Sequence, residues 1–282
     1  MIPTIAILTI REALNRRILA ALVGLTLLVV AATAWGFAKV AELSSNQNVS
    51  TVTLSLLTSQ LLVMVMFMFS FVLGMTAVFV ASPAIAGDIE SGVALSILAR
   101  PIRRAELLLG KWLGNAIVLV VYAIAGGALE LGVVRATTGY VPPEPVAFLL
   151  YLAAETVIGV TLAILLSTFI APMAGGAIAV VCFGLVWIAG IAGSIGELLN
   201  NETLVRVGVV TRLLLPTDGL WRGAVFSLEP VAVLASAGRA SALLGNPFLA
   251  NGAPTTPFLV WCGVWVVAVL AGAMLVFRAR EV

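Results

Sequence analysis

Long apolar runs separated by short charged stretches dominate the pattern of this chain. A helix that crosses the hydrocarbon core of a bilayer needs about 20 apolar residues, and six runs reach that length. The predicted spans cover residues 18–38, 52–81, 112–134, 146–170, 174–195 and 258–277. Backbone polar groups in lipid must be satisfied within the protein, which leaves membrane-spanning helices or a closed β-barrel. The strands of a barrel would alternate apolar and polar residues, whereas these runs are continuously apolar. We therefore predict an all-α polytopic membrane protein that forms a single transmembrane domain over residues 1–282.

The N-terminal stretch, residues 1–17, has the pattern of an amphipathic helix that lies on the membrane surface. Apolar residues recur at helical spacing along one face: Ile7, Ile10, Leu14 and Ile18. Glu12 and Arg16 are four residues apart on another face, where they can pair. The alternative is a signal peptide cleaved near Ala34, but the apolar run after Arg17 is longer than the core of such a peptide.

The connection between the second and third spans, residues 82–111, carries seven charged residues and predicts a short amphipathic helix. Ser82 can cap this helix with Pro83 at its first position, and Pro101 ends it. An apolar stripe follows at intervals of four residues: Ile85, Ile89, Val93 and Ile97. Such a helix either docks into a groove of a partner or lies on the membrane with its arginines extended into water. The spacing by itself favours neither.

The external segment before the last span, residues 196–257, is long and mixed in character. Two of its stretches, 203–215 and 231–244, contain arginines and are too short to cross about 30 Å of hydrocarbon. They predict interfacial or partly re-entrant helices that cover one side of the bundle. Asp218 and Arg222, four residues apart, predict a surface ion pair that caps an external helix.

Composition and charge narrow the class of protein and set its orientation. The chain is 62% hydrophobic and 10% charged, with a mean hydropathy of +1.18, which excludes a soluble domain and a disordered chain. Nine of the 15 basic residues lie in the N-terminal stretch, the 82–111 connection and the C-terminal tail. Six spans put these three regions on one side, which the positive-inside rule identifies as cytoplasmic. The net charge of +2 is too small to indicate a nucleic-acid partner.

The residues that the chain lacks exclude several kinds of site. It has no histidine, which excludes histidine-ligated zinc, histidine-ligated haem and a Ser-His-Asp triad. Cys182 and Cys262 lie in apolar runs and are expected to pack as small apolar residues. Neither Lys39 nor Lys111, the two lysines, ends a phosphate-binding loop of the form GxxxxGK(S/T). We therefore expect no metal or cofactor on this chain and no ATP hydrolysis by it.

Ionisable residues inside predicted spans are candidates for function. Glu130 lies near the outer end of the third span and Glu155 about ten residues into the fourth, and Arg135 is close enough in sequence to pair with either. The structural interpretation is a Glu–Arg pair, or hydrogen-bonded carboxylates, joining spans three and four. The functional interpretation is a proton- or cation-sensitive site that is coupled to transport.

Two further spans carry distinctive faces. The stripe on the second span consists of Gln60, Met64, Met68, Phe71 and Met75, with Met66 off that face. These side chains are expected to pack or to line an adaptable cavity, and the rival interpretation is handling of Cu(I) by methionine sulfur. The fifth span is rich in glycine, which permits close helix approach and predicts a dimer or cavity-lining face.

The 82–111 connection also carries the pattern of a known family. Glu90-x-Gly92, then ILARPIRR ending at Arg104, then LLGK ending at Lys111, resembles the first cytoplasmic loop of ABC-2 type transporter permeases. The resemblance extends over the surface helix, the six spans and the external segment. A second motif, Leu215-Pro216-Thr217-Asp218, resembles the branch that includes the permease of the nitrous-oxide-reductase copper-maturation cluster.

The resemblance implies a homodimer of this chain that works with two copies of a cytoplasmic ABC ATPase, which bind ATP and magnesium. The helix of the loop would be the coupling helix that seats in the ATPase. The implied coupling residues are Asp88, Glu90, Gly92, Arg100, Pro101, Arg103, Arg104, Gly110 and Lys111. The transport pathway would lie at the dimer interface, faced by spans one, two and five.

We therefore predict the permease subunit of an ABC-2 type exporter in a bacterial cytoplasmic (inner) membrane, surrounded by lipid, with both termini cytoplasmic. A periplasmic or extracellular accessory protein is a further partner to consider, and the sequence leaves the substrate open. The alternative is a motor-independent secondary transporter or a membrane scaffold that uses Glu130 and Glu155. Inverted repeats would favour the secondary transporter, but the surface helix and the charged loop have no counterpart in the second half.

Overall fold

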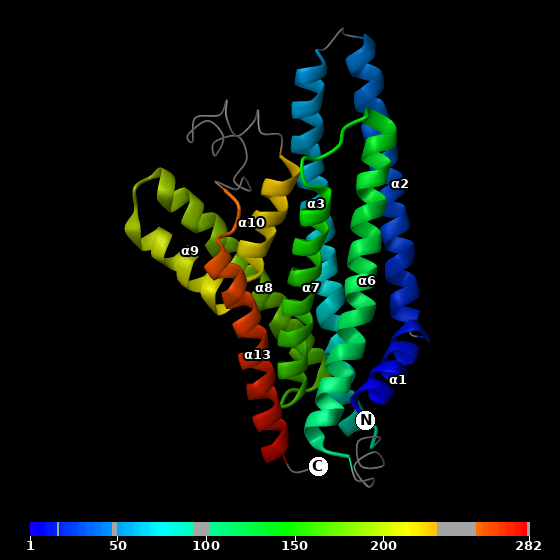
Figure 1. Cartoon of the computed structure of the whole chain (residues 1–282), viewed down its shortest axis with the longest axis vertical. Coiled ribbons are helices and arrows are strands. Elements are labelled where there is room, and N and C mark those ends of the chain that lie inside the picture. The colour runs from blue at the N-terminus through cyan, green and yellow to red at the C-terminus, as the bar shows by residue number, and fades with distance from the viewer. Residues whose placement is uncertain (16, 47–49, 93–101, 230–251, 281–282) are drawn as a thin grey trace.

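The computed structural model describes residues 1–15, 17–46, 50–92, 102–229 and 252–280, and every regular element in these ranges is a helix. Six helices are long and apolar enough to cross a membrane: α2 (Arg17–Asn46), α3 (Thr51–Ala81), α6 (Arg104–Thr138), α7 (Pro145–Ser167), α8 (Pro172–Leu198) and α13 (Thr256–Ala279). The shorter helices are α1 (Ile2–Asn15), α4 (Pro83–Glu90), α9 (Glu202–Leu214) and α10 (Thr217–Leu228). The all-helical class with six candidate spans is confirmed. Figure 1 shows both termini at the same end of the bundle, which we call the inner end, opposite the outer end.

Helix α7 lies in the centre of the bundle, in contact with α3, α6, α8, α10 and α13 (Figure 1). Its large side chains join two hydrophobic clusters. Phe148 packs with Trp221 in the outer half, and Ile164 packs with Leu108 and Phe277 in the inner half. Because α7 is surrounded by protein, its polar side chains must find partners on neighbouring helices.

The predicted helix of the 82–111 connection is present as α4, but α4 ends at Glu90 instead of continuing to Pro101, and residues 93–101 lie outside the described residues. The start of α4 also differs from the prediction. Ser82 does not cap α4 with its side chain; its hydroxyl donates to the carbonyl of Pro172 at 2.5 Å. The cap comes from Ser167 at the end of α7, whose Oγ accepts from the backbone N–H groups of Ile85 and Ala86 at 2.9 and 3.0 Å. One hydroxyl with two lone pairs thus satisfies two amides of the first turn and holds α4 against α7.

Helix α1 packs across α6 instead of only resting on the membrane. A Cβ at Gly110 or Gly114 of α6 would come within 2.6 Å of side-chain atoms of Ile5 or Thr9, so only glycine permits this approach. Of the predicted apolar stripe, Ile7 and Leu14 are exposed and Ile10 is partly buried against Val118 and its neighbours. The small-residue face of α1 was the missed signal, because it makes the contact with protein.

Helices α8 and α9 form a tightly packed antiparallel pair, and α10 follows on from α9 and packs against α7 and α8 (Figure 1). A Cβ at Gly193 of α8 would lie 3.0 Å from the Cα of Gly208 in α9. The close helix approach predicted for the glycines of the fifth span is therefore present at Gly193, where the approaching helix is α9 of the same chain. Helix α10 is the external helix that the spacing of Asp218 and Arg222 predicted, although its bounds were not predicted. The predicted stretch 231–244 lies outside the described residues.

Candidate functional site

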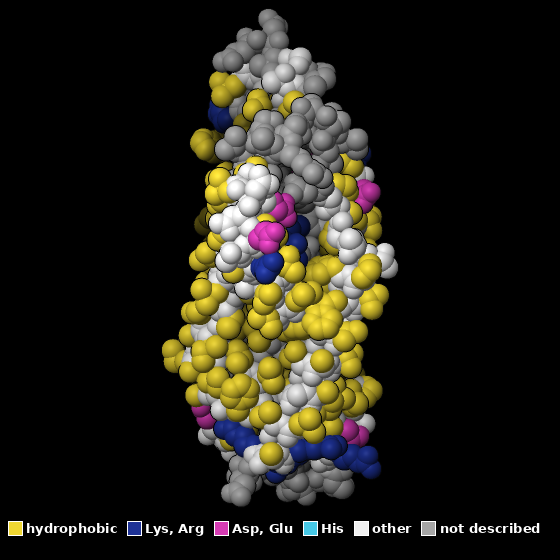
Figure 2. Space-filling view, turned by 90° about the vertical axis from the view of Figure 1, so that its left-hand side faces the viewer, with side chains coloured by type: hydrophobic (Ala, Val, Ile, Leu, Met, Phe, Trp, Pro, Cys, Tyr) yellow, Lys and Arg dark blue, Asp and Glu magenta, His cyan; other side chains and the backbone are white. Residues whose placement is uncertain are grey.

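The predicted coupling residues that are exposed lie at the inner end. Glu90 is exposed at the last position of α4, and Gly92 follows with φ of +74°, a left-handed conformation that favours glycine. Arg103 is exposed at the N-cap of α6, where its backbone N–H donates to Glu106 Oε2 at 3.1 Å. Figure 2 shows lysine and arginine side chains gathered at this end of the molecule.

Asp88 and Lys111, by contrast, pair with each other. Lys111 Nζ lies 2.8 Å from Asp88 Oδ2 and 3.2 Å from Glu12 Oε2, and only 8% of the lysine side chain is exposed. This inner ion cluster joins α1, α4 and α6. The predicted pairing of Glu12 with Arg16 is not described, because Arg16 lies outside the described residues.

Arg104 is also turned inward, toward the end of the last span. Its Nη1 donates to the carbonyl oxygens of Phe277, Arg278 and Arg280 at 2.9, 3.2 and 2.5 Å. A cation at these carbonyls satisfies the open end of α13 and opposes its negative dipole. Arg280 in turn donates to the carbonyl of Thr168 at 2.7 Å, which ties α13 to the end of α7.

The predicted coupling residues therefore fall into two groups, one exposed and one engaged in contacts between helices. Glu90, Gly92 and Arg103 face solvent at the inner end, whereas Asp88, Arg104, Gly110 and Lys111 build the platform beneath them. Arg100 and Pro101 lie outside the described residues. The loop signature thus combines surface residues with residues that hold helices together.

The stripe on the second span lies on the outside of the bundle. Met64 and Met68 are 61% and 52% exposed, while Met66 is fully buried in the core. Gln60, Phe71 and Met75 are partly buried. Packing within one chain therefore does not explain Met64 and Met68, and they face either lipid or another protein chain.

The two intramembrane carboxylates join different helices from those expected. Glu130 on α6 is fully buried and accepts from Thr33 of α2 at 3.5 Å, and Glu155 on α7 accepts from Ser70 of α3 at 2.8 Å. They tie span three to span one and span four to span two, not three to four. Arg135 is exposed, and no ion pair among the described residues joins it to either carboxylate.

The external motif forms a second ion cluster, and the prediction of a surface pair is wrong there. Asp218 is only 4% exposed, and its Oδ2 accepts from Nε of both Arg212 and Arg222, at 3.1 and 3.0 Å. Arg222 Nη2 also donates at 2.8 Å to the Gly190 carbonyl and to Ser194 Oγ, which adds α8 to α9 and α10. Spacing along one helix could not find Arg212, because the chain turns between it and Asp218.

Two neighbours of Asp218 in the external motif are also part of the fold. Pro216 stands at the N-cap of α10, where its missing N–H costs nothing, and Thr217 is fully buried. The motif is therefore the start of a helix embedded in protein. No group of three or more acidic or cysteine side chains within the described ranges is arranged to hold a metal ion.

Comparison with known families identifies the architecture. The family model described as ABC-2 family transporter protein matches residues 4–282. The chain belongs to the ABC-2 transporter family. Members of this family are membrane transport subunits that generally work with a cytoplasmic ABC ATPase. No curated protein matches the chain.

The match to the family includes the inner end of the molecule. An ABC-2 permease is a multi-pass membrane protein, and the match includes the whole connection from α3 to α6. Sequence reasoning missed Ser167, which braces this connection from the end of α7, and it missed the contact of Glu12 with Lys111. Their only sequence signal is an ordinary polar residue in or beside an apolar run.

Proposed function

We propose that this chain is the permease subunit of an ABC-2 type exporter, a homodimer driven by two copies of a separate cytoplasmic ATPase. The observation that carries the proposal is the inner end of α4 and α6, where Glu90 and Arg103 are exposed on a braced platform. A braced platform transmits displacement to the spans, whereas a loose loop would absorb it. Alternating access follows if ATP closes the motor, α4 moves with it and the spans repack.

The continuity of α3 and α4 supports this route. Ser82 links the two helices in helical conformation, and its N–H donates to the Val78 carbonyl at 2.8 Å. Movement of α4 therefore acts directly on α3, the helix that carries the exposed methionines. In the proposed homodimer these methionines face the second copy, where a flexible apolar surface can repack between states. On this proposal the inner end is cytoplasmic, in a bacterial inner membrane, and the copper-maturation branch stays a prediction.

The test is co-purification of the tagged full-length chain with its ATPase from the native host, read as ATPase stoichiometry and activity. Glu90→Ala and Arg103→Ala should each lower ATPase recovery or coupled hydrolysis at least fivefold. Glu202→Ala and Arg206→Ala are matched controls, because they remove the same charges from an exposed pair on α9. Unchanged coupling in both inner variants would overturn the assignment of α4 as the coupling helix.

A second candidate function is motor-independent transport through the two buried glutamates. The observation that favours it is that one oxygen of Glu130 and one of Glu155 have no hydrogen-bond partner within the described part of the chain. In vesicles without ATPase, this candidate requires substrate movement that Glu155→Gln abolishes. Movement that depends on ATP and survives Glu155→Gln would reject it.

A further inference from the structure

A cavity of about 320 Å³ opens in the outer half of the molecule, where the ends of α8 and α9 meet α10 and the start of α13. This volume is at the lower end of the range for small-molecule sites. In Figure 2 charged side chains border a hollow just above a broad apolar surface. The cavity is therefore placed where the polar headgroups of a bilayer would meet the protein.

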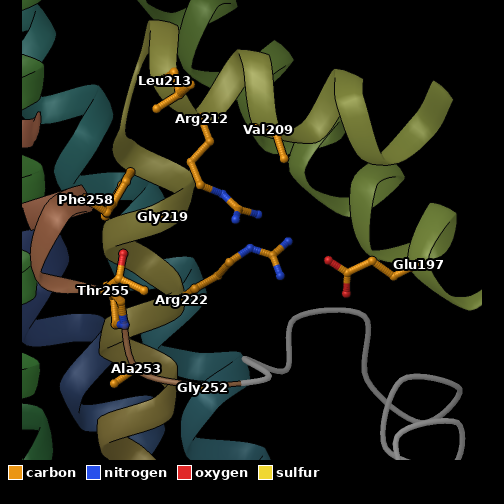
Figure 3. A pocket seen from close by; sticks show the side chains of 11 residues that line it. Glu197, Val209, Arg212, Leu213, Gly219, Arg222, Gly252, Ala253, Thr255 and Phe258 are labelled. Carbon is orange, nitrogen blue, oxygen red and sulfur yellow. The ribbon is translucent and has the colours of Figure 1, made fainter. Parts of the chain in front are cut away.

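Two guanidinium groups form one wall of the cavity. Arg212 and Arg222 share the single buried carboxylate of Asp218, so this wall carries one net positive charge. Figure 3 shows both guanidinium forks extending into the same open space. Among the described residues, Arg212 donates a hydrogen bond only through Nε, and the rest of its fork faces the cavity. Paired guanidinium forks match the several oxygens of a phosphate group.

The opposite wall carries a negative charge. Glu197, near the end of α8, is exposed, and its carboxylate points across the cavity toward Arg222 (Figure 3). A carboxylate offers about four acceptor sites, so it can receive an ammonium group in addition to other contacts. The apolar edges of the cavity, Val209 and Phe258, are suited to the hydrocarbon next to a headgroup.

We infer that this cavity binds a phosphoethanolamine group, with its phosphate on Arg212 and Arg222 and its ammonium on Glu197. The separation of charge across the cavity selects a zwitterion over a simple anion. A primary ammonium donates hydrogen bonds to a carboxylate, whereas a quaternary one prefers a cage of aromatic rings. Among the residues that the structure describes, Phe258 is the one aromatic side chain that lines the cavity. The source that best fits the position is a phosphatidylethanolamine lipid of the outer leaflet.

The inference does not depend on the proposed ATPase partner, so it is tested on the purified full-length chain alone. Native mass spectrometry would measure retention of phosphatidylethanolamine, phosphatidylglycerol and phosphatidylcholine. Arg212→Gln should lower phosphatidylethanolamine retention at least fivefold. Arg206→Gln, an exposed arginine on the same helix, should leave it within twofold. Equal retention in these two variants would overturn the site.

Glu197→Gln tests the ammonium contact, because it removes the charge of this exposed side chain and keeps Asp218 and its two arginines. It should lower the preference for phosphatidylethanolamine over phosphatidylglycerol at least fivefold while phosphatidylglycerol retention is kept. An unchanged preference would overturn the ammonium contact. Glycerophosphoethanolamine, which lacks acyl chains, distinguishes the sources. If it stabilises the protein against heat as much as the lipid does, the ligand is a soluble phosphoethanolamine and the lipid source is wrong.

Discussion

Two buried ion clusters stand at opposite ends of this molecule, and they are built with opposite signs. At the inner end one lysine, Lys111, lies between two carboxylates and joins α1, α4 and α6. At the outer end one carboxylate, Asp218, lies between two arginines and joins α8, α9 and α10. Among the described residues, the inner cluster thus holds two carboxylates and one cation, and the outer cluster holds one carboxylate and two cations.

The clusters differ in how easily they come apart. The side chain of Glu12 is 43% exposed, so it can turn to water if Lys111 moves. The outer carboxylate is closed in, because only 6% of the Asp218 side chain is exposed, whereas Arg222 and Arg212 are 15% and 30% exposed where they reach the cavity. Separation of charges that cannot reach water is costly. The inner cluster is therefore suited to a region that moves, and the outer cluster to one that stays fixed.

The largest effect is expected from Asp218→Asn, which leaves two arginines with no carboxylate between them. Loss of one member of a buried ion pair costs about 3–5 kcal/mol, and we expect that decrease in the free energy of unfolding. The thermal midpoint of the purified protein in detergent measures it. Glu202→Gln is the matched control, because it changes an exposed pair with the same i,i+4 spacing and should cost less than about 1 kcal/mol. If Asp218→Asn and Glu202→Gln lower the thermal midpoint equally, the outer cluster is not a stabilising element.

A comparable effect is expected from Glu229→Gln at high pH. Glu229 stands at the C-cap of α10 and is 1% exposed, and burial raises the pKa of its carboxyl to about 7. The folded state then holds a proton that the unfolded state, with a pKa near 4.5, releases. Its stabilising contribution is complete below pH 4.5 and is lost as the pH rises to 7. The difference is about 3 kcal/mol.

The measurement for Glu229 is the thermal midpoint from pH 4 to pH 8. The variant should gain stability over the native chain through this interval and keep the gain at higher pH. Glu144→Gln, in the neighbouring loop, is a control for the overall change in charge. If the thermal midpoints of the native chain and Glu229→Gln change in parallel with pH, Glu229 does not titrate between pH 4 and pH 8.

A smaller effect, about 2 kcal/mol, is expected from Lys111→Met. The substitution keeps the aliphatic stem and removes the cation, which leaves Asp88 and Glu12 facing each other. Lys39→Met is the natural comparison, since Lys39 forms an exposed pair with Glu42 and should cost less than about 1 kcal/mol. Coupled ATP hydrolysis should fall in Lys111→Met and stay unchanged in Lys39→Met. A loss of stability larger than that of Asp218→Asn would reverse our ranking of the clusters.

The smallest effects concern the glycines of α8. Gly193→Ala would place a methyl group 3.0 Å from the backbone of Gly208 and should cost about 1–2 kcal/mol by forcing α8 and α9 apart. Gly184→Ala meets no atom within 4 Å and should be neutral or stabilising by up to about 1 kcal/mol. Thermal midpoints of the two variants, measured side by side, test whether the outer cluster depends on this close helix contact.

Much of the candidate site could be anticipated from sequence, but only as a set of residues. The 82–111 pattern located the inner end, and Glu90 and Arg103 are exposed there as a docking surface requires. Arg104 belonged to the same pattern, yet it caps a helix 173 residues away in sequence. Charge and spacing in one segment cannot distinguish these roles, because each depends on what lies opposite.

The sequence by itself determined the membrane-spanning class and the number of spans. Each apolar run must leave water and satisfy its own backbone, whatever its neighbours are. The tertiary structure decided the partners of the polar residues: Glu12 for Lys111, Ser70 for Glu155 and Arg212 for Asp218. Burial makes an unpaired polar group costly, so each of these buried side chains needs a hydrogen-bond or ion-pair partner. Which residue becomes that partner depends on how the helices pack, and the sequence does not show this.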